Sequence, residues 1–216
     1  MSGAKTEQQT YHHGNLRAAA VEAALRAIDR DGRAGFSLRQ IASELNVVHS
    51  ALYRHFKDRE TLLAAVAEDA FARLLASHVA AREAAGANPT SRLKAVCRNQ
   101  VTFALENMAV YRLMFGPEVL PHRHPGTALH RASQSVLELA IDLVGRCQCA
   151  GELAGDDPML GGLVFWSAMH GVASLAIDDR LTPKLSDERS LGNLVELTIS
   201  GMVLGLKQVQ PWRDSR

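Results

Sequence analysis

The sequence has few cysteines and aromatic residues, and no long apolar segment. Its three cysteines, Cys97, Cys147 and Cys149, are odd in number and match no disulfide framework, which indicates a reducing compartment. Residues 1–13 are polar and lack the apolar core of a signal peptide. No run approaches the ~20 apolar residues that a membrane span requires. These absences predict a cytoplasmic protein with no membrane partner.

The chain also lacks an excess of charge of either sign. Its formal net charge is +1 at pH 7, so charge alone does not indicate a nucleic-acid partner. Hydrophobic residues make up 47% and charged residues 22%, which is typical of a globular protein and too apolar for a disordered one. A chain of 216 residues is long enough for one or two domains with their own cores.

Apolar residues recur at helical spacing along most of the sequence, and no alternating strand pattern is convincing. A first helix is expected from about Asn15 to Arg30, and Ser37 is expected to cap a short second helix that ends near Leu45. Later helices are expected over residues 58–85, 90–107, 127–148, 158–177 and 187–208, the first of them with Asp58 as its N-cap and "GANP" at its end. The sequence therefore predicts an all-α fold, with three small helices followed by a larger helical bundle.

The stretch "HSALYRHFKDRETLL", from His49 to Leu63, mixes aromatic and cationic residues after a tight turn, in which Asn46 is expected to tolerate the left-handed conformation. Two short helices joined by such a turn make a helix-turn-helix, whose second helix enters the major groove of DNA. Leu52 and Phe56 can pin this helix to the preceding one, which leaves its other side chains for bases and phosphates. A solvated basic helix would show a similar pattern. The expected DNA-binding residues are Ser37, Arg39, His49, Ser50, Tyr53, His55, Lys57 and Arg59.

A longer segment around this stretch carries a family resemblance. "GRAGFSLRQIASELNVVHSALYRHFKDRETLLAAV" resembles the DNA-binding domain of the TetR/AcrR family of bacterial regulators. Val48 stands where that family usually has Ser or Thr, and its apolar side chain is not expected to cap the following helix. "YHHGNLR" and "WSAMHGVASLAI" are similar to a subgroup with a Trp-His-Gly C-terminal signature. The resemblance implies a flexible arm (1–12), a helix-turn-helix domain (13–58) and a regulatory and dimerisation domain (59–210).

The larger domain is expected to hold a small-molecule site, as the resemblance implies. Trp166 and His170 share a helix face, and Gly171 is expected to permit close helix approach. Ordinary core packing is the alternative for each apolar candidate. The candidate ligand-binding residues are Phe103, Met108, Tyr111, Met114, Phe115, Trp166 and His170.

The last two helices are expected to form the dimer interface, with packing inside one chain as the alternative. The candidate interface residues are Leu191, Leu194, Val195, Thr198, Gly201, Met202 and Gly205. "PHRHP" contains His122 and His124, but no residue spacing matches a structural zinc site, so we expect neither a metal nor a cofactor. The histidines of this loop are expected to be solvated.

These observations favour a ligand-responsive transcriptional regulator. The predicted protein is a repressor that binds a near-palindromic DNA operator as a homodimer and is released by a partly apolar small molecule. A helical small-molecule-binding protein and a transcriptional activator of the same architecture are the alternatives. An enzyme is not expected, because no nucleophile–base pair or pair of carboxylates has a readable spacing.

Overall fold

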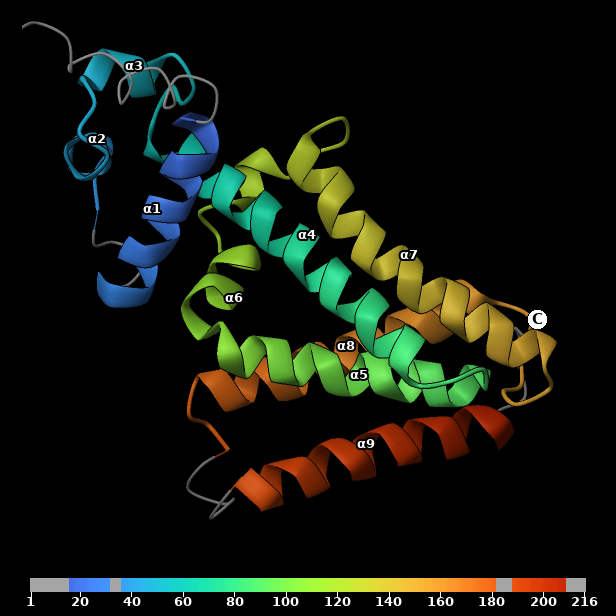
Figure 1. Ribbon diagram of the computed structural model, residues 1–216. Helices are drawn as coiled ribbons and strands as arrows, with labels where there is room; N and C mark the ends of the chain where they lie inside the picture. Colours follow the sequence, from blue (N-terminus) through green and yellow to red (C-terminus); the bar gives the residue numbers. More distant parts are fainter. Residues whose placement is uncertain (1–15, 32–35, 182–187, 209–216) are drawn as a thin grey trace, which may run out of the picture.

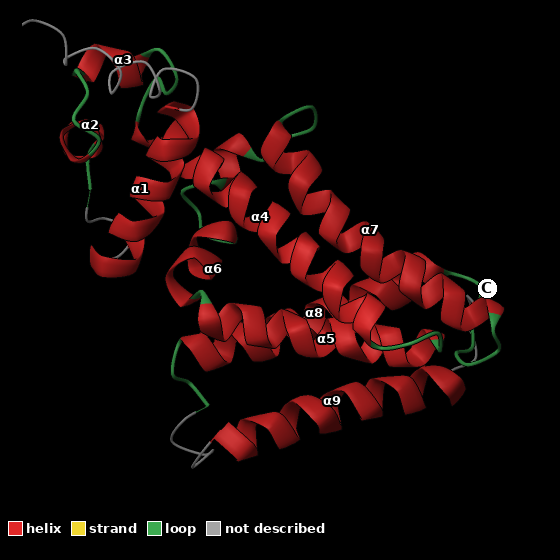
Figure 2. Cartoon of the chain, viewed as in Figure 1, coloured by secondary structure: helices red, strands yellow, loops and turns green. Residues whose placement is uncertain are grey.

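The computed structural model describes residues 16–31, 36–181 and 188–208, and every regular element in these ranges is a helix (Figures 1 and 2). The prediction of an all-α fold is confirmed, whereas the predicted arm, residues 1–12, lies outside the described residues. In chain order the elements are α1 (Leu16–Asp31), α2 (Leu38–Glu44), α3 (His49–Tyr53), α4 (Arg59–Ala84), α5 (Pro89–Glu106), α6 (Met108–Met114), the 3-10 helix η1 (Leu120–His122), α7 (Ala128–Cys149), α8 (Pro158–Ile177) and α9 (Glu188–Gln208).

Short-range capping sets the bounds of α4. The Asp58 carboxylate accepts a hydrogen bond from the backbone N–H of Thr61 at 2.8 Å, as a helix N-cap does. At the other end Gly86 has a φ of 80°, a left-handed conformation that glycine adopts without strain. The predicted start at Asp58 and the predicted end at "GANP" are both confirmed.

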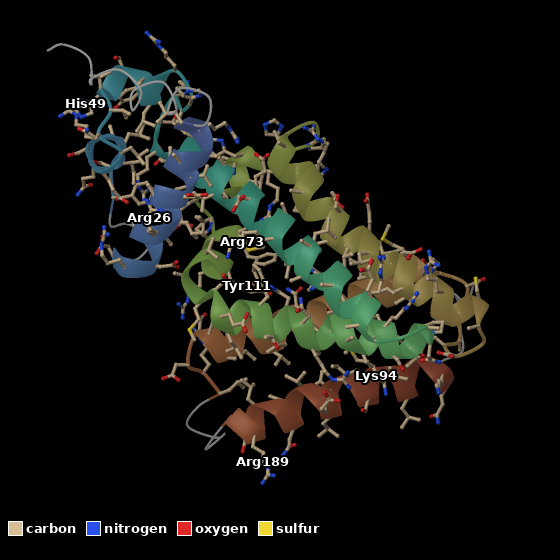
Figure 3. All side chains as sticks on the ribbon, viewed as in Figure 1. Arg26, His49, Arg73, Lys94, Tyr111 and Arg189 are labelled. Carbon is tan, nitrogen blue, oxygen red and sulfur yellow. The ribbon has the colours of Figure 1, made fainter. Side chains whose placement is uncertain are left out.

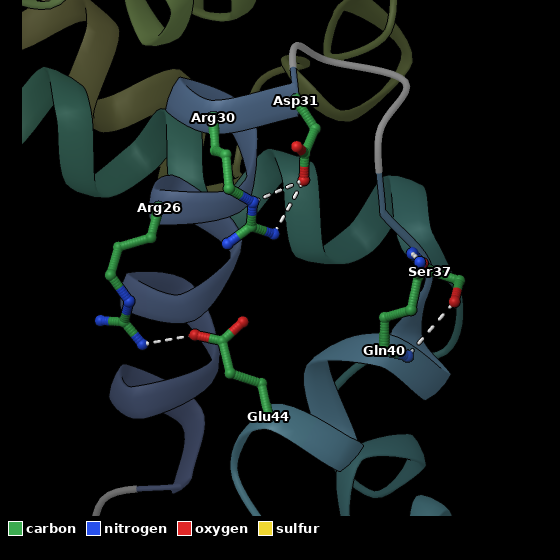
Figure 4. Close-up of polar contacts among 6 residues, drawn as sticks. All are labelled: Arg26, Arg30, Asp31, Ser37, Gln40 and Glu44. Carbon is green, nitrogen blue, oxygen red and sulfur yellow. Dashed lines mark hydrogen bonds and ion pairs between the residues drawn. The ribbon is translucent and has the colours of Figure 1, made fainter.

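The first three helices form a small unit at one end of α4 (Figure 1). Helix α1 packs against α2, α3, α4 and α6. Ile28, Ile41 and Leu52 are each at most 1% exposed, so one apolar residue from each of the three helices is fully buried. An ion pair of 2.9 Å between Arg26 and Glu44 joins α1 to α2 on the surface (Figure 4).

The remaining helices build the larger bundle. Helices α5 and α7 pack against each other and each packs against α4 and α8, while α9 lies along α5 and α8 (Figure 1). Helices α7 and α8 approach closely at Gly161 and Gly162, because a Cβ at Gly162 would lie 2.6 Å from Cγ1 of Ile141. A Cβ at Gly171 would meet nothing within 4 Å, so the expected close approach at Gly171 is wrong within this chain.

Helix α6 was not predicted. The chain breaks after α5 at Asn107, whose side-chain amide donates to the Phe103 carbonyl at 2.9 Å and whose side-chain oxygen accepts from Arg73 at 3.2 Å. These contacts end α5 and begin α6 in a new direction (Figure 1). As a result, Tyr111 lies inside the bundle, between α6 and the other helices (Figure 3).

Helix α8 is a long apolar helix, which the sequence analysis did not expect. Pro158–Ile177 has 20 residues and a mean hydropathy of 1.5, so its length and composition would suffice to cross a membrane. Core helices of proteins that never enter a membrane pass the same test. Here α8 packs against α5, α7 and α9. The expectation that no apolar run approaches the length of a membrane span is wrong, because α8 contains no charged residue.

Candidate nucleic-acid interface and ligand cavity

The turn between α2 and α3 follows from local chemistry. Ser37 and Gln40 form a capping box at the start of α2, in which the Ser37 hydroxyl accepts from the Gln40 N–H at 3.3 Å (Figure 4). Asn46 then takes the left-handed conformation, with a φ of 54°, as predicted. Val48 precedes α3 and makes no side-chain cap, which confirms the expectation drawn from its apolar side chain.

Helix α3 is divided into an anchoring side and an exposed side. Leu52 is 0% exposed and Phe56 is 1% exposed, so the two predicted anchors are buried. Tyr53 is 52% exposed, and His49 and Ser50 are also exposed. Figure 3 shows His49 on the outer side of the three-helix unit, away from the bundle. These three side chains are therefore accessible to a molecule that approaches α3.

The other predicted DNA-binding residues differ in their surroundings. Arg39, His55 and Lys57 are exposed, and Ser37 is exposed although it caps α2. Arg59 is only partly exposed. Its Nε donates to the Phe36 carbonyl at 3.1 Å, and its guanidinium lies 5.1 Å from the centre of the Phe36 ring. Arg59 therefore ties the start of α4 to the segment just before α2.

A cavity of about 320 Å³ opens in the larger domain. It is bounded by α4, α7, α8 and the segment between α6 and α7, and its volume lies at the small end of the range for ligand sites. The lining residues are Phe71, Phe115, Arg123, His130, Ser133, Gln134, Val136, Leu137 and Trp166.

Only some of the predicted ligand-binding residues reach this cavity. Phe115 and Trp166 line it, and His170 lies directly behind them, 4.2 Å from the Phe115 ring and stacked on Trp166 at 5.5 Å. Tyr111 follows at 5.0 Å from Phe115. The remaining three candidates do not line it: Phe103 and Met114 are buried and Met108 is exposed.

Tyr111 and His170 belong to a buried hydrogen-bond chain that joins four helices. The Asn99 amide donates to Nδ1 of His78 at 2.8 Å, so His78 carries its proton on Nε2 and donates it to Gln100 Oε1 at 2.9 Å. The Gln100 amide donates to the Tyr111 hydroxyl at 2.7 Å. That hydroxyl in turn donates to Nδ1 of His170 at 2.9 Å. Each group in this hydrogen-bond chain therefore donates to the next one, from Asn99 to His170.

Burial keeps the side chains of this hydrogen-bond chain uncharged. It lowers the pKa of His78 to about 4 and raises the pKa of the Tyr111 phenol. It also lowers the pKa of His170, and the positive charge of Arg123 lowers it further. Each histidine is thus held in the neutral form that the direction of the hydrogen bonds requires.

The histidine-rich loop lies between the cavity and the junction of the two domains. The two hydrogen bonds from Thr61 lower the pKa of Asp58, and nearby His122 adds a smaller electrostatic effect in the same direction. His122 is partly buried and His124 is exposed. Cys147 is buried and Cys149 exposed, and no group of three His, Cys, Asp or Glu side chains in the described part of the chain could hold a metal ion.

Helices α8 and α9 expose apolar residues at the edge of the bundle. Leu163 and Leu175 of α8 are exposed, and on α9 Leu197 is 73% exposed and Leu204 58%. Most of the predicted dimerisation residues face elsewhere on α9. Val195 is buried in the core, Met202 packs against it, Leu191, Leu194 and Thr198 are partly buried, and Gly201 and Gly205 are exposed.

Comparison with known families accounts for both halves of this architecture. Residues 20–66 match the model described as "Bacterial regulatory proteins, tetR family", and residues 93–198 match "Tetracyclin repressor-like, C-terminal domain". The chain belongs to the TetR family of bacterial transcriptional regulators. The TetR/AcrR family resemblance seen in the helix-turn-helix segment is confirmed. The names of the family and of its relatives also confirm the expectation of a regulator and not an enzyme.

Individual relatives agree with this assignment. The HTH-type transcriptional regulator Rv1816 of Mycobacterium tuberculosis is 30% identical over 142 residues, which cover 65% of this chain and 59% of the relative. The chain thus spans about three fifths of the length of the curated relatives that it matches. A solved protein of unknown function from Rhodococcus sp. RHA1 is 32% identical, with a TM-score of 0.80 over 93% of this chain and 100% of that one.

A more distant solved structure shares the TetR-family fold. AibR, solved in complex with isovaleryl coenzyme A and operator DNA, is 19% identical, with a TM-score of 0.60 over 84% of this chain and 96% of AibR. At this identity the likeness concerns the fold alone.

Sequence reasoning missed most of the residues that line the cavity of this TetR-family protein. Phe71 comes from α4, Arg123 follows η1, and the other five are on α7, namely His130, Ser133, Gln134, Val136 and Leu137. No local signal marks them, because they meet only through the packing of α4 against α7. The segment "PHRHP" contains Arg123, but it was considered only for metal binding and solvation by its two histidines.

Proposed function

We propose that this TetR-family chain is a cytoplasmic, ligand-responsive repressor. It binds a near-palindromic operator as a homodimer and leaves it when a small molecule occupies the cavity of the larger domain. The exposed side of α3 carries the DNA-binding part of the proposal. Leu52 and Phe56 are buried and anchor this segment to the three-helix unit. His49, Ser50 and Tyr53 are exposed to solvent.

The proposed DNA contacts follow from the positions of the side chains on α2 and α3. His49 and Ser50 are the first two residues of α3, the part of a recognition helix that meets base edges in the major groove, and Tyr53 is the last residue of this short helix. Exposed cations on either side, Arg39 and Lys57, are suited to phosphates. Arg59 contributes differently, by holding α4 to the Phe36 carbonyl.

Dimerisation is proposed through α8 and α9. Leu197, Gly201 and Leu204 of α9 recur at i, i+4 and i+7 and are exposed, and α8, which packs against α9, exposes Leu163 and Leu175. Two such helices from each subunit would bury these faces in a four-helix interface. A two-fold dimer presents two α3 helices, which suits half-sites about one helical turn apart or a multiple of it.

Release by ligand is proposed to pass through α4, which runs from the three-helix unit to the wall of the cavity. Its start is fixed by Asp58 and Arg59, and Phe71, further along, lines the cavity. A ligand that favours a different position of α4 would change the spacing of the two α3 helices. A preference of ~1–3 kcal/mol for the non-binding conformation would weaken operator binding about 5–150-fold.

Fluorescence anisotropy with labelled duplex DNA from just upstream of the gene tests this proposal. Binding should be sequence-specific and fall steeply as salt rises. Lys57→Ala should weaken binding and lower the slope of log K against log salt by about one, and Tyr53→Ala should weaken it without unfolding the protein. Arg146→Ala is the matched control, because Arg146 is exposed on α7 and pairs only with Asp142 on the same helix.

The outcomes separate a regulator from a carrier. If Lys57→Ala and Tyr53→Ala bind a selected operator as tightly as the parent protein, the placement of the recognition helix is wrong. If selection from genomic fragments returns no bound DNA at all, the repressor proposal is wrong and a helical small-molecule-binding protein is the better interpretation. If bound DNA is found and ligand tightens binding, the protein is an activator of the same architecture.

A further inference from the structure

The cavity of the larger domain has an unbalanced charge. Phe71, Phe115 and Trp166 supply aromatic walls, and Arg123 is a full positive charge at the same surface. None of the described residues that line the cavity is an aspartate or a glutamate. A molecule that enters this space therefore meets one cation and no anion.

Arg123 is half-buried and has no partner of opposite charge. Its guanidinium lies 5.9 Å from the centres of both the Phe71 and Phe115 rings. No ion pair or side-chain hydrogen bond to this guanidinium occurs in the described part of the chain, and burial lowers the pKa of Arg123. Withdrawing a charge from water without a partner is unfavourable, and an anion beside it would remove that cost.

We propose that the cavity binds a small organic acid, whose carboxylate pairs with Arg123 while its apolar body lies among Phe71, Phe115 and Trp166. Arginine suits this role because its planar fork donates two parallel hydrogen bonds to a carboxylate. The volume of about 320 Å³ fits a small molecule rather than a long chain. This inference rests on the proposed function, since it names the class of ligand that the regulator senses.

The position of Arg123 also connects the bound acid to the DNA-binding unit. A single 3-10 turn carries both His122 and Arg123, held by hydrogen bonds from His122 N to Val119 O at 3.0 Å and from Arg123 N to Leu120 O at 3.1 Å. Arg123 faces the cavity, and His122 lies close enough to Asp58, the N-cap of α4, to lower its pKa. A carboxylate that pulls on Arg123 therefore also pulls on the turn that carries His122, whose electrostatic effect reaches Asp58 at the start of α4.

Tryptophan fluorescence tests the proposal directly. The chain has two tryptophans, so a Trp212→Phe background leaves Trp166 in the cavity wall as the only reporter. The probes are benzoate, phenylacetate and hexanoate, each with its neutral amide as the matched control. We expect the acids to quench Trp166 with a Kd at least about tenfold lower than that of the amides.

Variants then assign the charge to Arg123. Arg123→Gln should weaken the acids about 10- to 100-fold and leave the amides unchanged, and Arg123→Lys should lie between. Arg131→Gln, an exposed arginine on α7 that does not line the cavity, should change nothing. If Arg123 only covers the two phenylalanine rings, Arg123→Gln will lower thermal stability and weaken acids and amides equally.

Three results overturn the inference: equal affinity for acids and amides, no effect of Arg123→Gln on the acids, or no quenching by any probe up to its solubility limit. Operator binding of the free protein, measured in parallel, keeps this failure separate from that of the proposed function. If operator binding persists while no acid binds, the regulator stands without this ligand class. If acids bind but no operator does, the anion site stands and the repressor proposal fails.

Discussion

Acidification should destabilise this protein before most of its carboxylates become protonated, because two histidines in the larger domain, the buried His78 and the partly buried His170, are held in neutral form. His78 is 2% exposed and holds a proton only on Nε2, which it donates to Gln100, while its Nδ1 accepts from Asn99. A second proton on His78 would face the NH2 group of Asn99, which is a donor and cannot accept it. Protonation therefore breaks the chain as well as placing a charge in the core.

The sign and size of the effect follow from the pKa of His78, which falls from 6.5 in the unfolded chain to about 4 in the folded one. The unfolded state binds the proton more tightly, so the free energy of unfolding falls as the pH drops through 6.5 and continues to fall until about pH 4. A difference of about 2.5 between the two pKa values, at ~1.4 kcal/mol per pKa unit, amounts to about 3.5 kcal/mol. His170 adds an effect of the same sign.

Urea unfolding between pH 7 and pH 4, at one protein concentration, measures this effect. In His78→Gln the titrating group is gone, so the slope of the unfolding free energy against pH should be shallower by about 1.4 kcal/mol per unit between pH 6 and pH 5. The variant will itself be less stable at pH 7, but the comparison concerns the slope alone. Long-range ¹H–¹⁵N spectra of the folded protein should show His78 neutral at pH 5, with its proton on Nε2.

Two results would refute this reasoning. Equal slopes in the parent and His78→Gln would show that His78 takes up no proton on unfolding in this range. A His78 ring that is protonated in the folded state above pH 6 would show that the hydrogen-bond chain does not hold it neutral. Either result would also weaken the assignment of the donor directions from Asn99 to His170.

Two further predictions concern packing and assembly. Gly162→Ala should lower the free energy of unfolding by about 1–3 kcal/mol, because the new carbon would lie 2.6 Å from Cγ1 and 3.1 Å from Cα of Ile141. Gly192→Ala, which meets nothing within 4 Å, should raise it by up to ~1 kcal/mol, and an equal cost at both sites in urea unfolding would contradict the observed α7–α8 contact. Leu197→Arg should convert the proposed dimer to a monomer in sedimentation velocity, whereas Met108→Arg, exposed on α6, should not. A dimer that survives Leu197→Arg would place the interface elsewhere.

The parts of the fold that follow short-range rules could be predicted from the sequence. Asn46 was expected in the left-handed conformation and Asp58 as an N-cap, because each acts on residues within one turn of itself. Leu52 and Phe56 were expected to be buried because they recur at helical spacing among polar residues. Such signals need no knowledge of what lies far away in the chain, and together they defined the helix-turn-helix.

Features that depend on distant partners were not predictable in the same way. Arg59 stays a predicted DNA contact, but the hydrogen bond to the Phe36 carbonyl and the contact with the Phe36 ring could not be predicted, because the fold brings them close. The close helix approach was expected at Gly171 and occurs at Gly162, because it depends on where Ile141 of α7 crosses α8. Helical periodicity identifies the face that a helix buries, but not the residue against which each position packs.

Helix α8 is the element where the proposed ligand site and the proposed dimer interface meet. Its glycines hold it against α7, and a small change at Gly162 is resisted by direct contact with Ile141. Trp166 lines the cavity on one flank of the same helix, while Leu163 and Leu175 remain exposed on its outer side. Because α8 is fixed on α7, a ligand that displaces Trp166 is more easily accommodated by movement of η1 and α4 than by a shift of α8 itself. Ligand binding is therefore expected to change the angle between the three-helix units while the α8–α9 interface stays in place.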